Sequence, residues 1–171
     1  MEGILIAIRT FFEAGGDVLF LIAAATFVMW ALIFERLWFI NTEHKQDVGS
    51  ALTHWESRAE RTSWNAHRIR ERMISEVNGR LNANMSFIKT LISLLPLLGL
   101  LGTVTGMVQV FEAMTYSGGN ARSMAAGVSM ATIPTMSGMV ATLSGVLANT
   151  YISSMVATES DYLEDTLTMD H

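Results

Sequence analysis

The chain has 171 residues, of which 50% are hydrophobic and 16% are charged, and its formal net charge is -5. A mean hydropathy of +0.35 indicates a membrane protein rather than a soluble one, and the length suggests a single domain. The absence of cysteine excludes disulfides and thiolate metal sites. Basic residues are mixed with acidic ones, which argues against a nucleic-acid partner. We expect no metal and no other cofactor.

The N-terminal part of the chain predicts one membrane span and a segment before it. Residues 1–17 have apolar side chains at helical spacing and predict an amphipathic helix, which either lies on the membrane surface or leads into the span. Residues 18–40 predict transmembrane helix 1, because about 20 mostly apolar residues cross a bilayer. Near its end we expect Trp38 to lie in the interfacial aromatic belt and Arg36 to extend towards the lipid headgroups.

A polar stretch without proline follows the first span. Residues 41–86 predict a helical segment made of two amphipathic helices. We interpret their charged faces as solvated surface, with a docking face for a partner or a neighbouring subunit as the alternative. Nine of the eleven Lys and Arg residues lie between Arg36 and Lys89, so the positive-inside rule predicts that this segment is cytoplasmic. The N-terminus is then outside and the C-terminus inside.

The rest of the chain predicts a helical hairpin and a tail. Residues 87–113 predict transmembrane helix 2 and residues 124–157 transmembrane helix 3, joined by a turn-rich loop at 114–123 on the outer side. Both helices are longer than a bilayer requires, so they extend into the cytoplasm or tilt. Residues 158–171 contain five acids and no Lys or Arg, and predict an acidic cytoplasmic tail. The predicted fold is all-α and integral to the membrane, with three transmembrane helices.

Small residues and prolines interrupt both spans of the hairpin. Gly102 and Gly106 form a GxxxG pair, a common motif of close helix packing. Pro96 and Pro134 each remove a backbone hydrogen bond inside a span and act as hinges or as fixed kinks. We assign helix packing to the glycines of the two spans: Gly99, Gly102, Gly106, Gly138 and Gly145.

Hydroxyl groups recur along one face of the third span. Thr132, Thr135 and Thr142 lie roughly on this face, together with Met139 and Asn149. The face either lines a narrow, partly wet ion pathway or packs against another helix, since Ser and Thr hydroxyls also bond to carbonyls of their own helix.

Charged residues are absent from the two spans of the hairpin. Neither residues 90–111 nor residues 124–157 contain Asp, Glu, His, Lys or Arg. A proton path normally requires a carboxylate or a histidine at membrane depth. If the chain belongs to an ion-driven machine, we therefore expect a partner to supply the titrating carboxylate.

Two motifs of the hairpin resemble the MotA/TolQ/ExbB proton-channel family. Residues 95–106 read LPLLGLLGTVTG, which is similar to the family pattern P-x-L-G-L-L-G-T-V-x-G. Residues 127–141 resemble the family signature G-I-x-E-A-L-x-x-T-x-x-G-L-x-A more loosely, and residues 35–38 resemble the end of the first span in ExbB-like chains. The resemblance covers residues 18–152.

The resemblance implies a short ExbB-type subunit of the bacterial inner membrane, with its outer loop in the periplasm. Such subunits form a homo-oligomeric ring, typically a pentamer, around single-span ExbD-like subunits whose membrane aspartate carries the ion. By motif position Thr103 and Thr135 face that aspartate, and the helical spacing adds Thr132 and Thr142 to the lining. The complex uses the proton-motive force to drive a TonB-like protein, which opens outer-membrane transporters for iron-siderophores, haem or vitamin B12.

Two positions depart from the family pattern. Met130 stands where the family has an acidic residue, so no role of that acid can be transferred to this chain. Ser144 stands where a proline is usual, while Pro134 occurs earlier, which suggests that the kink has moved. The cytoplasmic segment is also shorter than in the best-known ExbB and TolQ chains, as expected of a divergent or accessory ExbB.

Other functions remain open at this level. A TolQ-like subunit of an envelope-constriction motor and a non-conducting membrane scaffold are the alternatives. A flagellar stator subunit is disfavoured, because those chains have four spans and a long cytoplasmic insertion. An enzyme is least favoured, because no cluster of His, Asp, Glu or Ser has catalytic spacing. The sequence does not decide between proton and sodium, and it fixes neither subunit count nor cargo.

Overall fold

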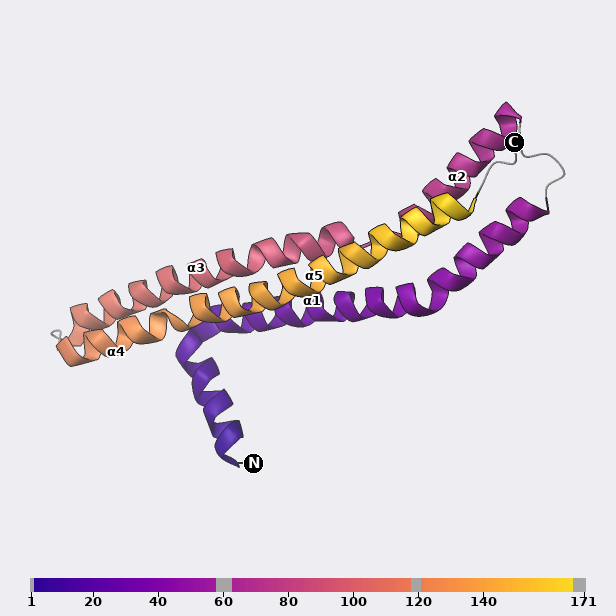
Figure 1. Ribbon diagram of the computed structural model, residues 1–171. Helices are drawn as coiled ribbons and strands as arrows, with labels where there is room; N and C mark the ends of the chain where they lie inside the picture. Colours follow the sequence, from indigo (N-terminus) through magenta and orange to yellow (C-terminus); the bar gives the residue numbers. More distant parts are fainter. Residues whose placement is uncertain (1, 58–62, 118–120, 168–171) are drawn as a thin grey trace. The chain divides into compact units, whose positions relative to one another are not determined.

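The described residues of the chain, 2–57, 63–117 and 121–167 of a computed structural model, form five α-helices (Figure 1). In chain order the helices are α1 Glu2–Glu56, α2 Trp64–Leu81, α3 Met85–Ser117, α4 Ala121–Ala131 and α5 Ile133–Thr166. Three stretches are long and apolar enough to cross a membrane, and they lie within Gly15–Thr42, Trp64–Thr115 and Gly127–Thr166. The expectation of an all-helical chain with three candidate membrane spans is confirmed.

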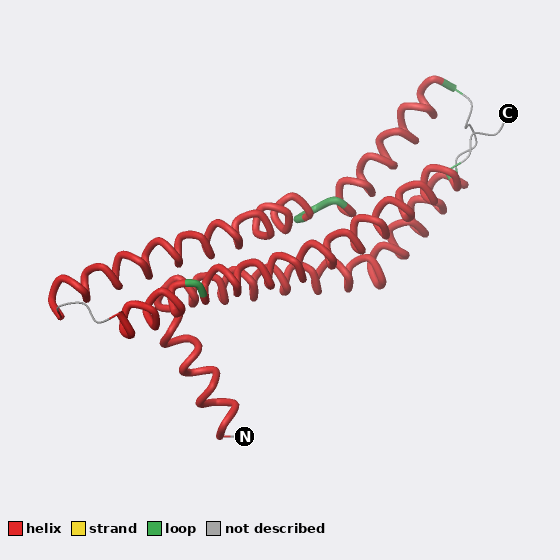
Figure 2. The backbone as a smooth tube through the Cα atoms, turned by 60° about the vertical axis from the view of Figure 1, so that its left-hand side comes forward, coloured by secondary structure: helices red, strands yellow, loops and turns green. Residues whose placement is uncertain are grey.

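Helix α1 changes direction at Gly16. This residue has φ 64° and ψ -167°, a backbone conformation that only glycine adopts without strain, and it interrupts the helical geometry. Figures 1 and 2 show the segment before Gly16 turned away from the helix that follows it. Leu5, Ile6 and Phe11 of this segment are exposed. An apolar surface of this kind is suited to the membrane boundary.

The chain divides into two compact units, each made of segments from both halves of the sequence. The first unit comprises residues 1–30 and 89–146, and the second comprises residues 31–88 and 147–171. Helices α1, α3 and α5 each contribute residues to both units.

In the first unit, α3 packs closely against α4 and the beginning of α5. A Cβ atom built on Gly106 would lie 2.7 Å from the Cβ of Ala131, so the two backbones approach as only small residues permit. The third predicted span is divided at Thr132, where the helical trace is interrupted between α4 and α5 (Figure 2). The proline that follows, Pro134, has no N–H to donate to the carbonyl of Met130, and this favours an interruption here.

The second unit is held together by an apolar cluster that the three helices α1, α2 and α5 share. Trp55 of α1 is 2% exposed, and Leu163 near the end of α5 is fully buried. The buried members are Val48, Trp55, Ala66, Val77, Leu163 and Leu167, with Leu52, Met73 and Ile74 packed against them. The stretch interpreted as an acidic tail is thus helical up to Thr166 and contributes two buried leucines.

Two arginines of the second unit satisfy carbonyl groups at helix ends. Arg70 of α2 donates to the carbonyl oxygens of Glu164 (2.7 Å) and Leu167, and its guanidinium thereby caps the C-terminus of α5. Arg36 of α1 is only 5% exposed and donates to the carbonyl oxygen of Arg80 (2.8 Å) at the end of α2. Its guanidinium also pairs with the carboxylate of Glu35 (3.0 Å), so its hydrogen-bond partners are protein groups and not the lipid headgroups expected from the sequence.

Candidate functional site

Two threonine hydroxyls meet between α3 and α5 in the first unit. The Oγ1 atoms of Thr103 and Thr135 are 2.9 Å apart. Thr135 donates to the carbonyl oxygen of Gly99 (2.8 Å), and Thr103 has the carbonyl oxygens of Leu100 (2.9 Å) and Gly99 (3.3 Å) as further acceptors. Both side chains are half-buried. The structure thus joins the two residues that the motif comparison selected.

Glycines on both helices make this contact possible. A Cβ on Gly99 would lie 3.0 Å from the Cα of Thr135 and 3.1 Å from the carbonyl oxygen of Pro134. A Cβ on Gly138 would lie 2.7 Å from the carbonyl oxygen of Leu95. In both cases the obstacle is backbone, which cannot move aside as a side chain can. The hydroxyl pair therefore depends on glycine at these two positions.

The other predicted lining threonines lie apart from this pair. Thr132 is exposed at the α4–α5 interruption, and it donates to the carbonyl oxygen of Ser129 (2.7 Å). Thr142 is half-buried further along α5, where it donates to the carbonyl oxygen of Gly138 (2.8 Å) and lies 3.5 Å from that of Ile92 on α3. Hydroxyls that bond back to their own helix stabilise packing without an external partner.

The remaining predicted packing and kink residues fall in different surroundings. A Cβ on Gly102 would overlap the ring of Pro134, and one on Gly145 would lie 2.5 Å from the sulfur of Met29. Pro96 lies inside α3, which stays one continuous helix, while Pro134 follows the interruption at Thr132. Gly102 and Pro134 thus lie on facing helices, next in sequence to Thr103 and Thr135.

The two spans that carry the hydroxyl pair have no charged side chains. Residues 90–111 and 124–157, which carry the pair, contain no ionisable side chain of the Asp, Glu, His, Lys or Arg type. Within the described ranges no three His, Asp or Glu side chains gather as a metal site would need. The pair can offer and accept hydrogen bonds, but it cannot itself take up or release a proton near neutral pH.

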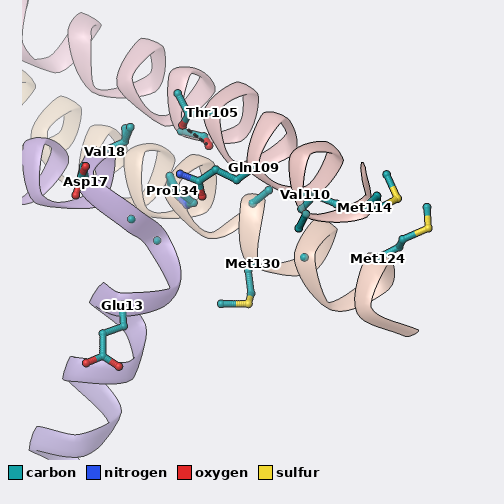
Figure 3. Close-up of a pocket in the computed structure, with 17 residues that line it drawn as sticks. Glu13, Asp17, Val18, Thr105, Gln109, Val110, Met114, Met124, Met130 and Pro134 are labelled. Atoms are coloured by element: carbon teal, nitrogen blue, oxygen red, sulfur yellow. Dashed lines mark hydrogen bonds between the residues drawn. The ribbon is translucent and has the colours of Figure 1, made fainter. Parts of the chain in front are cut away.

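A cavity of about 540 Å³ lies beside the pair in the first unit (Figure 3). Gly102 and Pro134 belong to its lining, as do Asp17 of α1 and Thr105 and Gln109 of α3. Gln109 extends from α3 towards Pro134 in Figure 3. This cavity could not be predicted from the sequence, since nothing in the hydropathy pattern connects Asp17 with the second span. Gly16, which precedes Asp17, is the local sequence signal of the bend in α1 that places Asp17 at the cavity.

Comparison with known proteins agrees with the motifs. The family model described as the MotA/TolQ/ExbB proton channel family matches residues 40–165. The ExbB-like 1 protein of Synechocystis sp., which is named as a biopolymer transport protein, is 34% identical over 87 residues. That alignment covers 48% of this chain and 34% of the relative, so the chain matches about a third of the relative's length.

Proposed function

Since this chain belongs to the MotA/TolQ/ExbB proton channel family, we propose that it is an ExbB-like subunit of a membrane motor driven by the proton-motive force. In this proposal a homo-oligomeric ring, typically a pentamer, sits in the bacterial inner membrane. The ring surrounds a single-span ExbD-like partner and drives a TonB-like protein. The cargo class is that of TonB-dependent outer-membrane transport: iron-siderophores, haem or vitamin B12.

The observation that carries the proposal is the contact between Thr103 and Thr135, whose Oγ1 atoms are 2.9 Å apart in spans that contain no Asp, Glu, His, Lys or Arg. Two half-buried hydroxyls do not titrate near neutral pH, but they can solvate an ion-bearing group that reaches them. A charged carboxylate is costly at membrane depth, whereas a protonated acid can donate a hydrogen bond to the oxygen lone pairs of the threonines. The site therefore supports a function in which a partner brings the acid and this chain supplies the oxygens.

The distribution of basic residues along the chain supports the topology of such a motor. Most basic residues belong to the second unit, which the positive-inside rule assigns to the cytoplasm. The hairpin end at residues 114–123 is then periplasmic. The exposed apolar segment before Gly16 lies at the periplasmic surface of the inner membrane. Met130, at the position of the family's acid, is exposed and uncharged, so the proposal assigns it no part in ion transfer.

Reconstitution tests the proposal. The chain is purified with the proteins that bind it, the intact complex is weighed, and proton entry into vesicles is followed with a pH-sensitive dye under an imposed membrane potential. We expect several copies of the chain with a single-span protein that carries a membrane aspartate, and proton entry only from the complex. Replacement of that aspartate by asparagine should abolish the flux. A monomeric chain, or a chain that conducts protons by itself, would refute the proposal.

A further inference from the structure

We propose that the cavity between the bend of α1 and the α3–α4 hairpin is a binding site for one phospholipid whose headgroup carries an ammonium group. This inference needs only the membrane location of the chain and is independent of its role in a motor. A volume of about 540 Å³ is within the range of sites that hold small organic ligands, about 300–1,000 Å³.

The lining of the cavity is divided between acidic and apolar groups. The charged residues of the lining are Glu13 and Asp17, both from α1, and the lining has no Lys, Arg or His. Glu13 is already paired with Arg9 (2.8 Å), whereas no described side chain forms an ion pair with Asp17. The opposite wall carries methionines, among them Met114 and Met124 at the end of the hairpin (Figure 3). A ligand that fits both walls has a cationic head and an apolar body.

The depth of the cavity matches the level of lipid headgroups. The first membrane-crossing stretch begins at Gly15, so Asp17 lies within the first turn of the span. Two polar side chains of α3 line the cavity, Thr105 and Gln109. The hydroxyl of Thr105 already donates to carbonyls of its own helix. The amide of Gln109 can donate a hydrogen bond to a phosphate or ester oxygen of the lipid. An ammonium next to Asp17 and a phosphate next to Gln109 would reproduce the charge order of an ethanolamine headgroup.

Close helix packing forms the inner wall of the cavity. A Cβ on Gly106 would meet Ala131, and one on Gly127 would lie 2.5 Å from a methyl group of Val110. The wall is therefore the contact between α3 and α4 itself. An acyl chain can lie along this wall, beside the methionine thioethers, which adapt to irregular shapes.

Native mass spectrometry of the intact protein tests the site. The chain is released from nanodiscs that contain equal amounts of two lipids with identical acyl chains, phosphatidylethanolamine and phosphatidylglycerol. We expect preferential retention of phosphatidylethanolamine, and we expect Asp17→Asn to lower that preference by about two- to fivefold, as for the loss of one exposed ion pair. Equal retention of both lipids, or an unchanged preference in Asp17→Asn, would overturn the proposal.

Matched variants separate this site from general effects of charge and size. Glu112→Gln removes an exposed acid near the same end of α3 that does not line the cavity, and should leave the preference unchanged. Ala113→Trp fills the cavity and should remove the bound lipid, while Ala125→Trp, on an exposed position outside it, should not. If Ala113→Trp keeps its lipid and instead alters the number of subunits, a second copy of the chain occupies the cavity and the proposal fails.

Discussion

Replacement of Thr135 by valine removes one hydroxyl from the Thr103–Thr135 pair and keeps the shape of the side chain. The variant loses the contact with Thr103 (2.9 Å) and the bond to the carbonyl of Gly99 (2.8 Å). Side-chain hydrogen bonds within membrane proteins average about 0.6 kcal/mol each, so the loss of stability should be about 1 kcal/mol. Because the packing volume is unchanged, we expect the ring to assemble.

The effect on ion transfer should be larger than the effect on stability. A hydrogen bond to a charged group contributes about 1.5–3 kcal/mol, which corresponds to a rate factor of about 10 to 150. If the pair solvates a passing charge, Thr135→Val should slow proton flux within that range, and Thr135→Ser should restore most of it. A loss of about 1 kcal/mol in stability together with a larger loss in proton flux indicates a role in the ion path. A loss of stability without a loss of flux indicates a role in packing.

The assay is proton entry into vesicles that contain the complex, normalised to the amount of intact ring. Thr26→Val is the matched control, since the hydroxyl of Thr26 bonds to the carbonyl of Ile22 in its own helix (2.7 Å) and to no other group in the described part of the chain. The control should conduct as the wild type does. A flux in Thr135→Val within twofold of the wild type, from an intact ring, would refute the reasoning.

Four further substitutions test the helix packing, the end of α5 and the bend of α1. Gly138→Ala should destabilise the hairpin by about 1–3 kcal/mol in thermal unfolding followed by circular dichroism, because its Cβ would lie 2.7 Å from the carbonyl oxygen of Leu95. Gly79→Ala, where the Cβ meets open space, should instead be neutral or stabilise by up to about 1 kcal/mol, and equal effects would contradict the packing. Arg70→Ala should raise amide hydrogen exchange in the last turn of α5 by about tenfold, since two carbonyls lose their cap, and unchanged exchange would argue against it. Gly16→Ala should lower the free energy of unfolding by about 1–3 kcal/mol, because alanine is strained at φ 64°. A variant that keeps both its stability and the spin-label distance across the bend would disprove this.

Hydropathy and motif spacing were sufficient to predict the helical class and three candidate spans. The resemblance to the MotA/TolQ/ExbB family selected Thr103 and Thr135, although the sequence could not indicate that their hydroxyls touch. That contact depends on how α3 and α5 cross, which is set by Gly99 and Gly138 together. A single glycine in a span is compatible with many crossing angles, so spacing alone does not determine the partner.

The features that the sequence did not predict depend on contacts between distant segments. The buried position of Leu163 arises because α2 and α1 provide the rest of its cluster, and the charge of the surrounding stretch conceals this in the sequence. Arg36 resembles an interfacial anchor by its place at the end of an apolar run. Its burial follows from the carbonyl of Arg80, 44 residues later, which no local pattern specifies.

The number of hydroxyl hydrogens on Thr103 and Thr135 determines which charge this site accepts most readily. Each hydroxyl has one hydrogen, and each hydrogen has an acceptor within the chain: the other threonine or the carbonyls of Gly99 and Leu100. Only oxygen lone pairs remain for a visitor. A cation or a protonated acid meets these lone pairs directly, whereas an anionic carboxylate must first turn a hydroxyl and break a bond. The threonine pair thus favours the protonated form of an approaching acid over its charged form.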